Sequence, residues 1–245
     1  MSLYFLTSSP TGTLDGSRLP EKGFDEYNSF SEKIKANWKQ NSRCIYIASD
    51  PATRQRLLEA RDFFREAIYK EGLSCDCFDI LDDYRRDITR VQLQSYDVIF
   101  LSGGHVPTQN RFFEEISLKE KITGFEGIII GISAGTMNSA DIVYAQPEEE
   151  GESLDPNFRR FLKGLGLTKI MILPHYQMEK DFYLDGKRLY EDITYPDSYG
   201  NLFIAIPDGS YLLIENGKET IYGEAYRIEN GTKTQICSLG ESITL

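Results

Sequence analysis

A serine between glycines lies where an apolar run gives way to a helical stretch. The run is Gly127–Ile130, and the next five residues, Gly131–Gly135, read Gly-Ile-Ser-Ala-Gly with Ser133 at their centre. Gly-x-Ser-x-Gly between a strand and a helix is typical of a nucleophile elbow, a strained turn that exposes the serine hydroxyl at the edge of a sheet. We predict Ser133 as a catalytic nucleophile. The alternative is a common strand-to-helix turn in which Ser133 only caps the helix.

A serine hydroxyl becomes a good nucleophile only when a base accepts its proton, and histidine is the usual base near neutral pH. The chain contains two histidines, His105 and His175. His175 follows the predicted strand Lys169–Leu173 directly after Pro174, so we predict it as the base, the alternative being a structural histidine. His105 follows a pair of glycines and is expected to line the substrate-binding pocket, unless it is an exposed loop side chain.

The base needs an acid that orients it and stabilises the imidazolium. One candidate is Asp208, in Ile-Pro-Asp-Gly after the predicted strand Asn201–Ile206, and the other is Glu148 in the acidic run Glu148–Glu150, 15 positions after the serine. We prefer Asp208 because it ends a strand at the same sheet edge. The alternatives are an ordinary turn aspartate and a solvated acidic loop.

Acyl transfer also requires N–H donors for the tetrahedral oxyanion. The backbone N–H of Ala134, next to the serine, is one candidate donor. Gly103 and Gly104 follow a predicted strand, and their backbone can approach a substrate closely because they have no side chains. We predict an oxyanion hole from these three residues, although a glycine pair after a strand is also a common turn.

Strand-like and helix-like segments alternate along most of the chain. The predicted strands are Leu3–Ser8, Arg43–Ser49, Cys75–Leu81, Asp97–Leu101, Gly127–Ile130, Lys169–Leu173 and Asn201–Ile206. The predicted helices are Asp25–Lys39, Ala52–Glu71, Asp87–Gln94, Gln109–Ile122, Asn157–Leu165 and one within Glu179–Ile193. This alternation predicts an α/β fold with a mostly parallel sheet covered by helices on both faces.

The C-terminal part instead shows short β segments, two of whose connections are the hairpin signals Asn216-Gly217 and Asn230-Gly231. The segments are Tyr211–Glu215, Glu219–Tyr222, Glu224–Ile228 and Thr234–Ser238. We expect an antiparallel extension of the sheet, within a single domain spanning 1–245. In such sheets the site lies beyond the carboxyl ends of the strands, and Gly103, Gly104, Ser133, His175 and Asp208 each fall just after a predicted strand.

Composition excludes several other classes of protein. With 27 Lys and Arg against 38 Asp and Glu, the net charge of −11 argues against affinity for nucleic acid or anionic membranes. We expect no signal peptide or transmembrane helix. The four cysteines have no zinc-binding spacing and predict reduced thiols in a cytoplasmic protein, with a redox or catalytic cysteine as the minor alternative. No metal or cofactor is expected, and the sequence does not predict the oligomeric state.

Together these motifs resemble the peptidase E family of serine peptidases, whose best-known members are aspartyl dipeptidases, within the class I glutamine amidotransferase-like superfamily. The motifs are Leu101–Gly104, Gly131–Gly135, Leu173–His175 and Ile206–Leu212. The resemblance implies a three-layer α/β/α sandwich, with Ser133 as nucleophile and His175 as base. It places the acid near Glu148 or at the position of Asp208, where family members usually carry Glu.

The resemblance also bears on the substrate. Aspartyl dipeptidases have an arginine downstream of the histidine that holds the acidic side chain of the substrate, and Arg188 lies in roughly that region. The implied function is hydrolysis of small peptides, with a preference for N-terminal Asp if Arg188 binds that side chain rather than lying in a solvated basic pair. Two alternatives are another serine hydrolase, such as an esterase, and a non-catalytic amidotransferase-like domain that binds a small molecule or partner.

Overall fold

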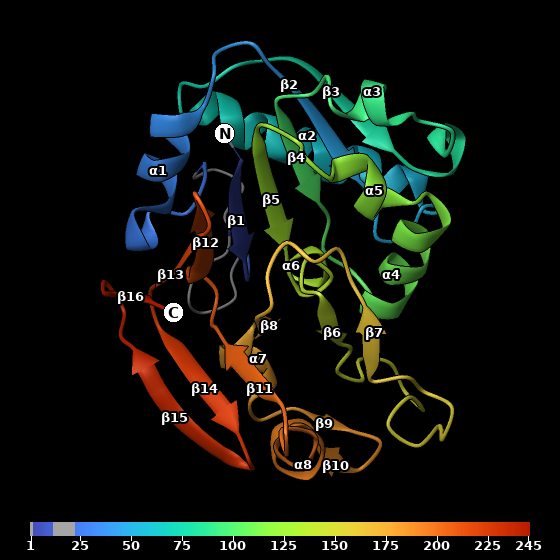
Figure 1. The fold of residues 1–245 in the computed structure, drawn as a ribbon, viewed down its shortest axis with the longest axis vertical. Coiled ribbons are helices and arrows are strands. Elements are labelled where there is room, and N and C mark those ends of the chain that lie inside the picture. The colour runs from blue at the N-terminus through green and yellow to red at the C-terminus, as the bar shows by residue number, and fades with distance from the viewer. Residues whose placement is uncertain (1, 12–22) are drawn as a thin grey trace.

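A mixed sheet of eight strands forms the centre of the computed structural model, which describes residues 2–11 and 23–245 (Figure 1). From edge to edge the strands are β16 (Ser242–Thr244), β13 (Lys218–Tyr222), β12 (Tyr211–Glu215), β1 (Leu3–Thr7), β5 (Ile128–Ile132), β4 (Val98–Leu101), β2 (Ser42–Ile47) and β3 (Cys75–Leu81). The five strands from β1 to β3 are parallel, and β12, β13 and β16 are antiparallel to their neighbours. The predicted domain also includes residues 1 and 12–22, which lie outside the described residues.

Helices cover both faces of this sheet, which gives the expected three-layer α/β/α arrangement. The α-helices are α1 (Phe30–Asn37), α2 (Arg54–Lys70), α3 (Arg90–Leu93), α4 (Val106–Glu115), α5 (Leu118–Ile122), α6 (Ala134–Met137), α7 (Tyr176–Glu179) and α8 (Tyr195–Asp197). Short 3-10 turns lie at η1 (Tyr27–Ser29) and η2 (Asp83–Arg85), and η3 (Leu189–Thr194) is a π-helical turn.

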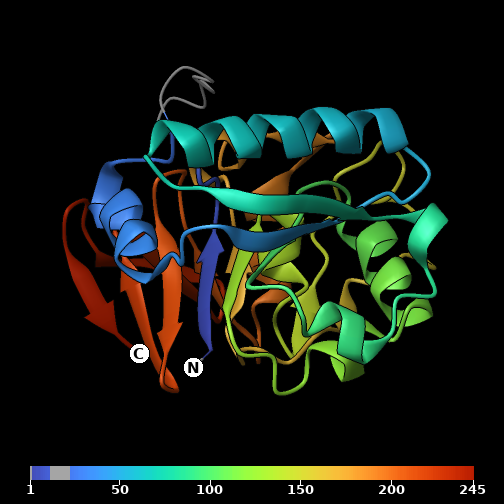
Figure 2. The same ribbon diagram turned by 90° about the horizontal axis from the view of Figure 1, so that it is seen from above.

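The strand register explains which helices pack where. Phe5 on β1, Phe100 on β4 and Tyr46 on β2 occupy equivalent register positions, so their side chains share one face. On that face Phe30 of α1 packs edge-on against Phe5, with ring centroids 5.6 Å apart, and Phe64 of α2 lies 5.5 Å from Phe100. Figure 2 shows α2 running along β3 and β2. Helix α6 packs on the other face, against Leu101 of β4.

A second sheet, of four strands in the described residues, packs against the same face as α6. Its order is β15 (Thr232–Cys237), β14 (Ala225–Glu229), β11 (Leu202–Ala205) and β8 (Met171–Leu173), with β8 and β11 parallel. Leu6 of β1, Ile172 of β8 and Ile204 of β11 belong to one buried apolar cluster that joins the two sheets. The central and second sheets therefore bring the ends of β1, β5, β8 and β11 toward one another.

Two helix predictions need correction. Asn157–Leu165 is not helical: it forms a turn followed by β7 (Phe161–Lys163), which pairs with β6 (Ile142–Tyr144), a strand that the sequence did not reveal. Gly164 lies so close to Ala140 O that a Cβ would be 2.2 Å away. The predicted helix Gln109–Ile122 is divided into α4 and α5 at Ser117, whose φ is 51°.

The segment Glu179–Ile193 contains a two-strand hairpin, β9 (Tyr183–Leu184) and β10 (Lys187–Arg188), before η3. Both Asn-Gly hairpins are confirmed, since Asn216, Gly217, Asn230 and Gly231 all have positive φ. All four cysteines are free thiols. None of the helices in the described residues has both the length and the apolar character needed to cross a bilayer.

Candidate active site

Ser133 occupies the sharp turn between β5 and α6. Its backbone angles, φ 49° and ψ −110°, lie in a region that residues other than glycine rarely adopt, and two hydrogen bonds hold it there. The Ser133 N–H donates to the carbonyl oxygens of both Thr7 and Ser8, at 3.2 Å each. The local strain that the elbow motif predicts is therefore present, and it is stabilised by the end of the neighbouring strand β1.

The flanking glycines make this turn possible. A Cβ on Gly135 would lie 2.3 Å from the carbonyl oxygen of Leu101, and one on Gly131 would lie 2.9 Å from Thr136 Oγ1. The first contact would push α6 away from the sheet, because a backbone carbonyl cannot move aside as a flexible side chain can. The second would crowd α6 less severely, since Thr136 Cα would also lie 3.1 Å from the added Cβ. The two glycines are thus required by close packing between β5, β4 and α6.

His175 and Asp208 are hydrogen-bonded to each other. His175 is the N-cap residue of α7 just after β8, Asp208 follows β11, and the parallel pairing of these strands brings the two residues together. The distance between His175 Nδ1 and Asp208 Oδ1 is 2.7 Å. In the tautomer with a proton on Nδ1, the imidazole donates to the carboxylate and keeps Nε2 free to accept a proton.

Ser8 completes this arrangement, although no motif around it in the sequence points to such a role. Its hydroxyl donates to Asp208 Oδ1 at 2.6 Å and accepts from the backbone N–H of His175 at 2.8 Å. Ser8 is fully buried directly after β1, so it follows a strand end like the other site residues. One hydroxyl therefore fixes both the carboxylate and the backbone of the histidine.

Asp208 stays ionised in this environment. Burial acts to raise the pKa of its carboxyl, but the hydrogen bonds from His175 and Ser8 and the charge of His175 outweigh burial and lower the pKa below 3.8. A carboxylate at this position can stabilise an imidazolium without taking its proton.

Ser133 and His175 both line a cavity of about 230 Å³, together with Glu148 and Glu179. No hydrogen bond joins Ser133 Oγ to His175 within residues 2–11 and 23–245. Catalytic hydrogen bonds are often long before substrate binds, so shared lining of one cavity is compatible with proton transfer. A second cavity, of about 700 Å³, is also lined by Ser133, together with Gly103, Gly104 and His105.

The three predicted oxyanion donors lie around Ser133. Ala134 is the first residue of α6, so its N–H is not used by the hydrogen bonds of the helix itself. A Cβ on Gly103 would lie 3.5 Å from Ser133 Cβ, which places the Gly103 backbone beside the nucleophile. Gly104 has φ 147°, and a Cβ there would lie 2.3 Å from Ser49 Oγ. Position 104 thus admits a side chain only at a cost, whereas a Cβ on Gly103 would meet its neighbours at ordinary van der Waals distance.

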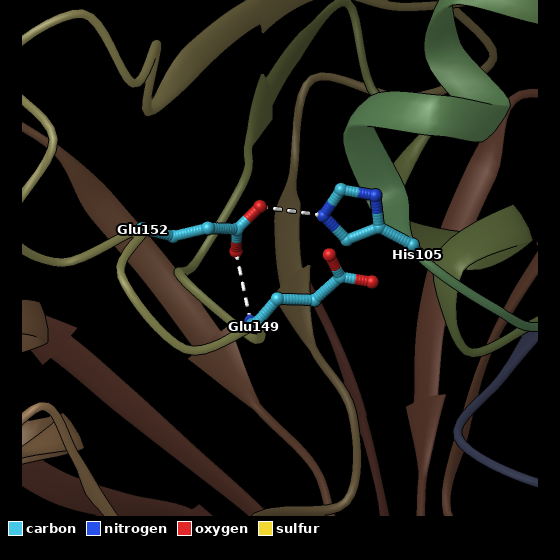
Figure 3. A group of neighbouring side chains, drawn as sticks. All are labelled: His105, Glu149 and Glu152. Atoms are coloured by element: carbon cyan, nitrogen blue, oxygen red, sulfur yellow. Dashed lines mark hydrogen bonds and ion pairs between the residues drawn. The ribbon is translucent and has the colours of Figure 1, made fainter.

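His105 lines the larger cavity but is bound to protein groups on both ring nitrogens. Its Nδ1 lies 2.8 Å from Thr108 Oγ1, and its Nε2 lies 2.8 Å from Glu152 Oε1. Figure 3 shows one oxygen of the Glu152 carboxylate bonded to the His105 ring and the other bonded to the backbone N–H of Glu149. This second oxygen also accepts the backbone N–H of Glu148, so Glu152 fixes the acidic loop against the start of α4.

The ligand atoms of His105, Glu149 and Glu152 lie within 4.8 Å of one another, a spacing that a metal ion could use. The hydrogen bonds just described already account for the His105 ring and the Glu152 carboxylate. The arrangement is explained as a clamp on the loop without a cation.

Glu148, the alternative acid, has quite different surroundings from Asp208. Its pKa is raised from 4.5 to about 8, mainly because its carboxyl is buried. A hydrogen bond from the Val106 N–H opposes this rise, and repulsion from Glu152, Glu179 and Glu149 adds to it. Because Glu148 as a residue is exposed, solvent screens part of this effect. Its carboxyl is thus poorly suited to stabilise a positive imidazolium near neutral pH.

Arg188 is not brought into this site. It ends β10, and its guanidinium donates to both carboxylate oxygens of Asp192, at 3.1 and 2.7 Å. The next residue, Leu189, lines the smaller cavity instead.

Comparison with known proteins gives a consistent picture. Residues 20–222 match the family model of Peptidase family S51. A solved peptidase from an acI-B1 Actinobacterium has a TM-score of 0.60 and 17% identity, over 100% of this chain and 96% of its own. A putative peptidase E protein from Listeria monocytogenes EGD-e has a TM-score of 0.53 and 16% identity, over 97% of this chain and 98% of its own. No curated protein sequence matches the chain.

At these identities the two structures support the fold, and the family match supports the kind of enzyme. The elbow serine and the histidine–carboxylate pair are the parts that a serine peptidase needs. Because the family match covers residues 20–222, most of the chain, this protein belongs to peptidase family S51, the peptidase E family, and is a serine-type peptidase.

Proposed function

We propose that Ser133, His175 and Asp208 form a catalytic triad that hydrolyses small peptides through an acyl-enzyme. The observation that carries this proposal is the 2.7 Å hydrogen bond between His175 Nδ1 and Asp208, next to a cavity that Ser133 also lines. It supports the proposal because a histidine fixed in this way presents Nε2 to a serine proton.

In the proposed reaction, Ser133 Oγ attacks the carbonyl carbon of the peptide bond while its proton passes to His175 Nε2. The N–H of Ala134 and those of Gly103 or Gly104 stabilise the oxyanion. Collapse of the tetrahedral intermediate breaks the C–N bond, and His175 gives its proton to the departing amine. Water then attacks the acyl-enzyme with His175 again as base, which releases the carboxylic acid and restores Ser133.

Asp208 is the proposed third member in preference to Glu148. Asp208 contacts His175 directly and has a lowered pKa, whereas the Glu148 carboxyl accepts from the Val106 N–H and has a raised pKa. Only the former combination keeps a negative charge beside the imidazolium.

The preference for N-terminal Asp that the family resemblance implies depends on Arg188. Asp192 already binds its guanidinium fork through two oxygens, so substrate would have to compete with this pair. The preference stays a prediction, and it can be tested by comparing the hydrolysis of dipeptides that differ in their first residue.

Ser133→Ala is the direct test of the nucleophile. It should lower peptide hydrolysis by about 10³-fold or more, because the acyl-enzyme can no longer form. A fluorophosphonate should label the wild type at Ser133 and leave the variant unlabelled, as read by mass spectrometry of the modified peptide. Ser198→Ala, which removes another buried hydroxyl, is the control and should keep both properties. Unchanged turnover in Ser133→Ala would refute the triad, and a wild type without labelling or hydrolysis would favour a non-catalytic binding domain.

A further inference from the structure

The smaller cavity beside Ser133 and His175 is acidic. Glu148 from the loop after β6 and Glu179 at the end of α7 both line it, and its described lining contains no lysine or arginine. Because the two candidate catalytic residues border the same cavity, part of any substrate attacked by Ser133 must lie in or next to it. The two glutamates therefore determine the charge that a substrate group meets at this point.

Neither carboxyl is neutralised by the protein. Within the described ranges, Glu148 and Glu179 take part in no ion pair with a lysine or arginine. Their charged neighbours are mostly acidic: Glu149 and Glu152 raise the pKa of Glu148, and only His175 acts on Glu179 as a positive neighbour. Glu148 is exposed as a residue and Glu179 is half-buried, so solvent screens part of their repulsion, but two carboxylates in one cavity whose described lining holds no lysine or arginine still favour a ligand that supplies positive charge.

We propose that this pocket, formed by Glu148 and Glu179 beside Ser133, binds a positively charged group of the peptide substrate. The group is an ammonium or guanidinium adjacent to the scissile bond, supplied by the free amino terminus or by a lysine or arginine side chain. This inference rests on the proposed peptidase function and adds the charge of the preferred substrate.

The rest of the lining fits such a group. Met137, Leu189 and Phe182 give the pocket apolar walls, and the stems of lysine and arginine are aliphatic chains that pack on apolar surface while the charged end reaches carboxylates. An aspartate side chain would instead meet two carboxyls. Arg188, which adjoins the lining residue Leu189, is paired with Asp192 and does not itself line the pocket.

A panel of dipeptides separates the two sources of positive charge. Lys-Ala, Met-Ala and Asp-Ala share an alanine leaving group and differ in the charge of the first side chain, and each can be compared with its N-acetyl form. If the pocket takes a side chain, kcat/KM for Lys-Ala should exceed that for Met-Ala by about tenfold or more, and that for Asp-Ala should be the lowest. If it takes the amino terminus, acetylation should lower kcat/KM by a similar factor for all three.

Variants then connect the preference to the pocket. Glu148→Gln and Glu179→Gln keep the shape of each side chain but remove its charge. Each should lower the wild-type preference by about tenfold, whether that preference is the kcat/KM ratio of Lys-Ala to Met-Ala or that of a free peptide to its N-acetyl form. Glu150→Gln is the matched control, because Glu150 belongs to the same acidic loop but does not line the pocket. Its ratios should equal those of the wild type.

The outcomes separate this inference from the proposed function. Hydrolysis of Met-Ala with fluorophosphonate labelling of Ser133, but without preference for Lys or for a free amino terminus, would overturn the cation pocket and leave the triad intact. Fastest cleavage of Asp-Ala, or ratios that neither glutamine variant changes, would overturn it as well. Absence of both labelling and hydrolysis would overturn the triad and the pocket together.

Discussion

Asp208 and Glu148 are two carboxyls at the same histidine-lined site, and their surroundings shift their pKa values in opposite directions. Asp208 is only 3% exposed, so burial alone would raise its pKa. The hydrogen bonds from His175 and Ser8 and the charge of His175 reverse that effect. Glu148 also has a buried carboxyl, but its neighbours are other glutamates, and its pKa rises to about 8.

The comparison shows that partners, rather than burial, determine which carboxyl remains charged. A carboxylate held by a histidine and a hydroxyl is suited to orient a base. A carboxyl among other carboxyls is suited to receive a cation. The same edge of the fold thus divides into a hydrogen-bond network around His175 and, in the described residues, an acidic pocket around Glu148 and Glu179 whose lining holds no lysine or arginine.

Substitution of each acid in turn should give the largest difference between the two carboxyls, measured as kcat. Asp208→Asn is expected to lower kcat by about 10³–10⁴-fold, because the amide no longer stabilises the imidazolium and favours the wrong tautomer. Glu148→Gln should lower kcat for a neutral peptide by less than about tenfold, because its carboxyl does not contact His175. Steady-state kinetics of both variants on one peptide measures the difference.

Asp208→Glu serves as the conservative control, since it keeps the carboxylate and carries the residue usual at this position in the family. It should lose less activity than Asp208→Asn. A larger loss in Glu148→Gln than in Asp208→Asn would make Glu148 the acid of the triad.

A smaller effect is expected from Ser8, which tests the hydrogen-bond network around His175 and Asp208. Ser8→Ala removes the donor to Asp208 and the acceptor for the His175 N–H, so kcat should fall about tenfold with KM nearly unchanged. Ser198 is a close match: it is also fully buried, donates to Tyr195 O at 2.7 Å and accepts from Gly231 N at 2.8 Å.

Both Ser8→Ala and Ser198→Ala should lower the free energy of unfolding by about 1–3 kcal/mol, because each leaves a partly buried backbone N–H without its acceptor. Only Ser8→Ala should lower kcat. Equal kcat in the two variants would mean that Ser8 has a structural role alone.

Features with a local cause could be predicted from the sequence. Strands Cys75–Leu81 and Tyr211–Glu215 have the predicted bounds, since short, mostly apolar segments that follow or precede turn residues suffice to define them. The placement of Ser133, His175 and Asp208 after strand ends also follows from local pattern, because parallel strands gather their carboxyl ends at one edge.

Features that depend on distant contacts could not be predicted. Ser8 is 200 positions from Asp208 and 167 from His175 in the sequence, so no spacing connects them. The wrong helix over Asn157–Leu165 has the same origin: β7 exists because β6 pairs with it. The position of Arg188 likewise depends on a short hairpin that precedes η3 and directs the next residue, Leu189, to the pocket.

The smallest expected effect is on the free energy of unfolding. At high pH the ionised form of Glu148 should lower it, and the ionised form of Asp208 should raise it. The folded protein keeps a proton on Glu148 up to about pH 8, whereas the unfolded chain releases it near its ordinary pKa of 4.5. The wild type therefore loses stability as pH rises between these values. Glu148→Gln should be more stable than wild type at pH 9, by up to about 1 kcal/mol after solvent screening, but not at pH 4.

Asp208 has a lowered pKa, so its contribution to stability is present above pH 3.8 and lost as pH falls through the folded pKa. Asp208→Asn should accordingly be less stable than wild type at pH 9, which urea unfolding of both variants at pH 4 and pH 9 would measure. If Glu148→Gln destabilised the protein at pH 9, its carboxylate would have to be ionised and paired, and the contrast between the two acids would not hold.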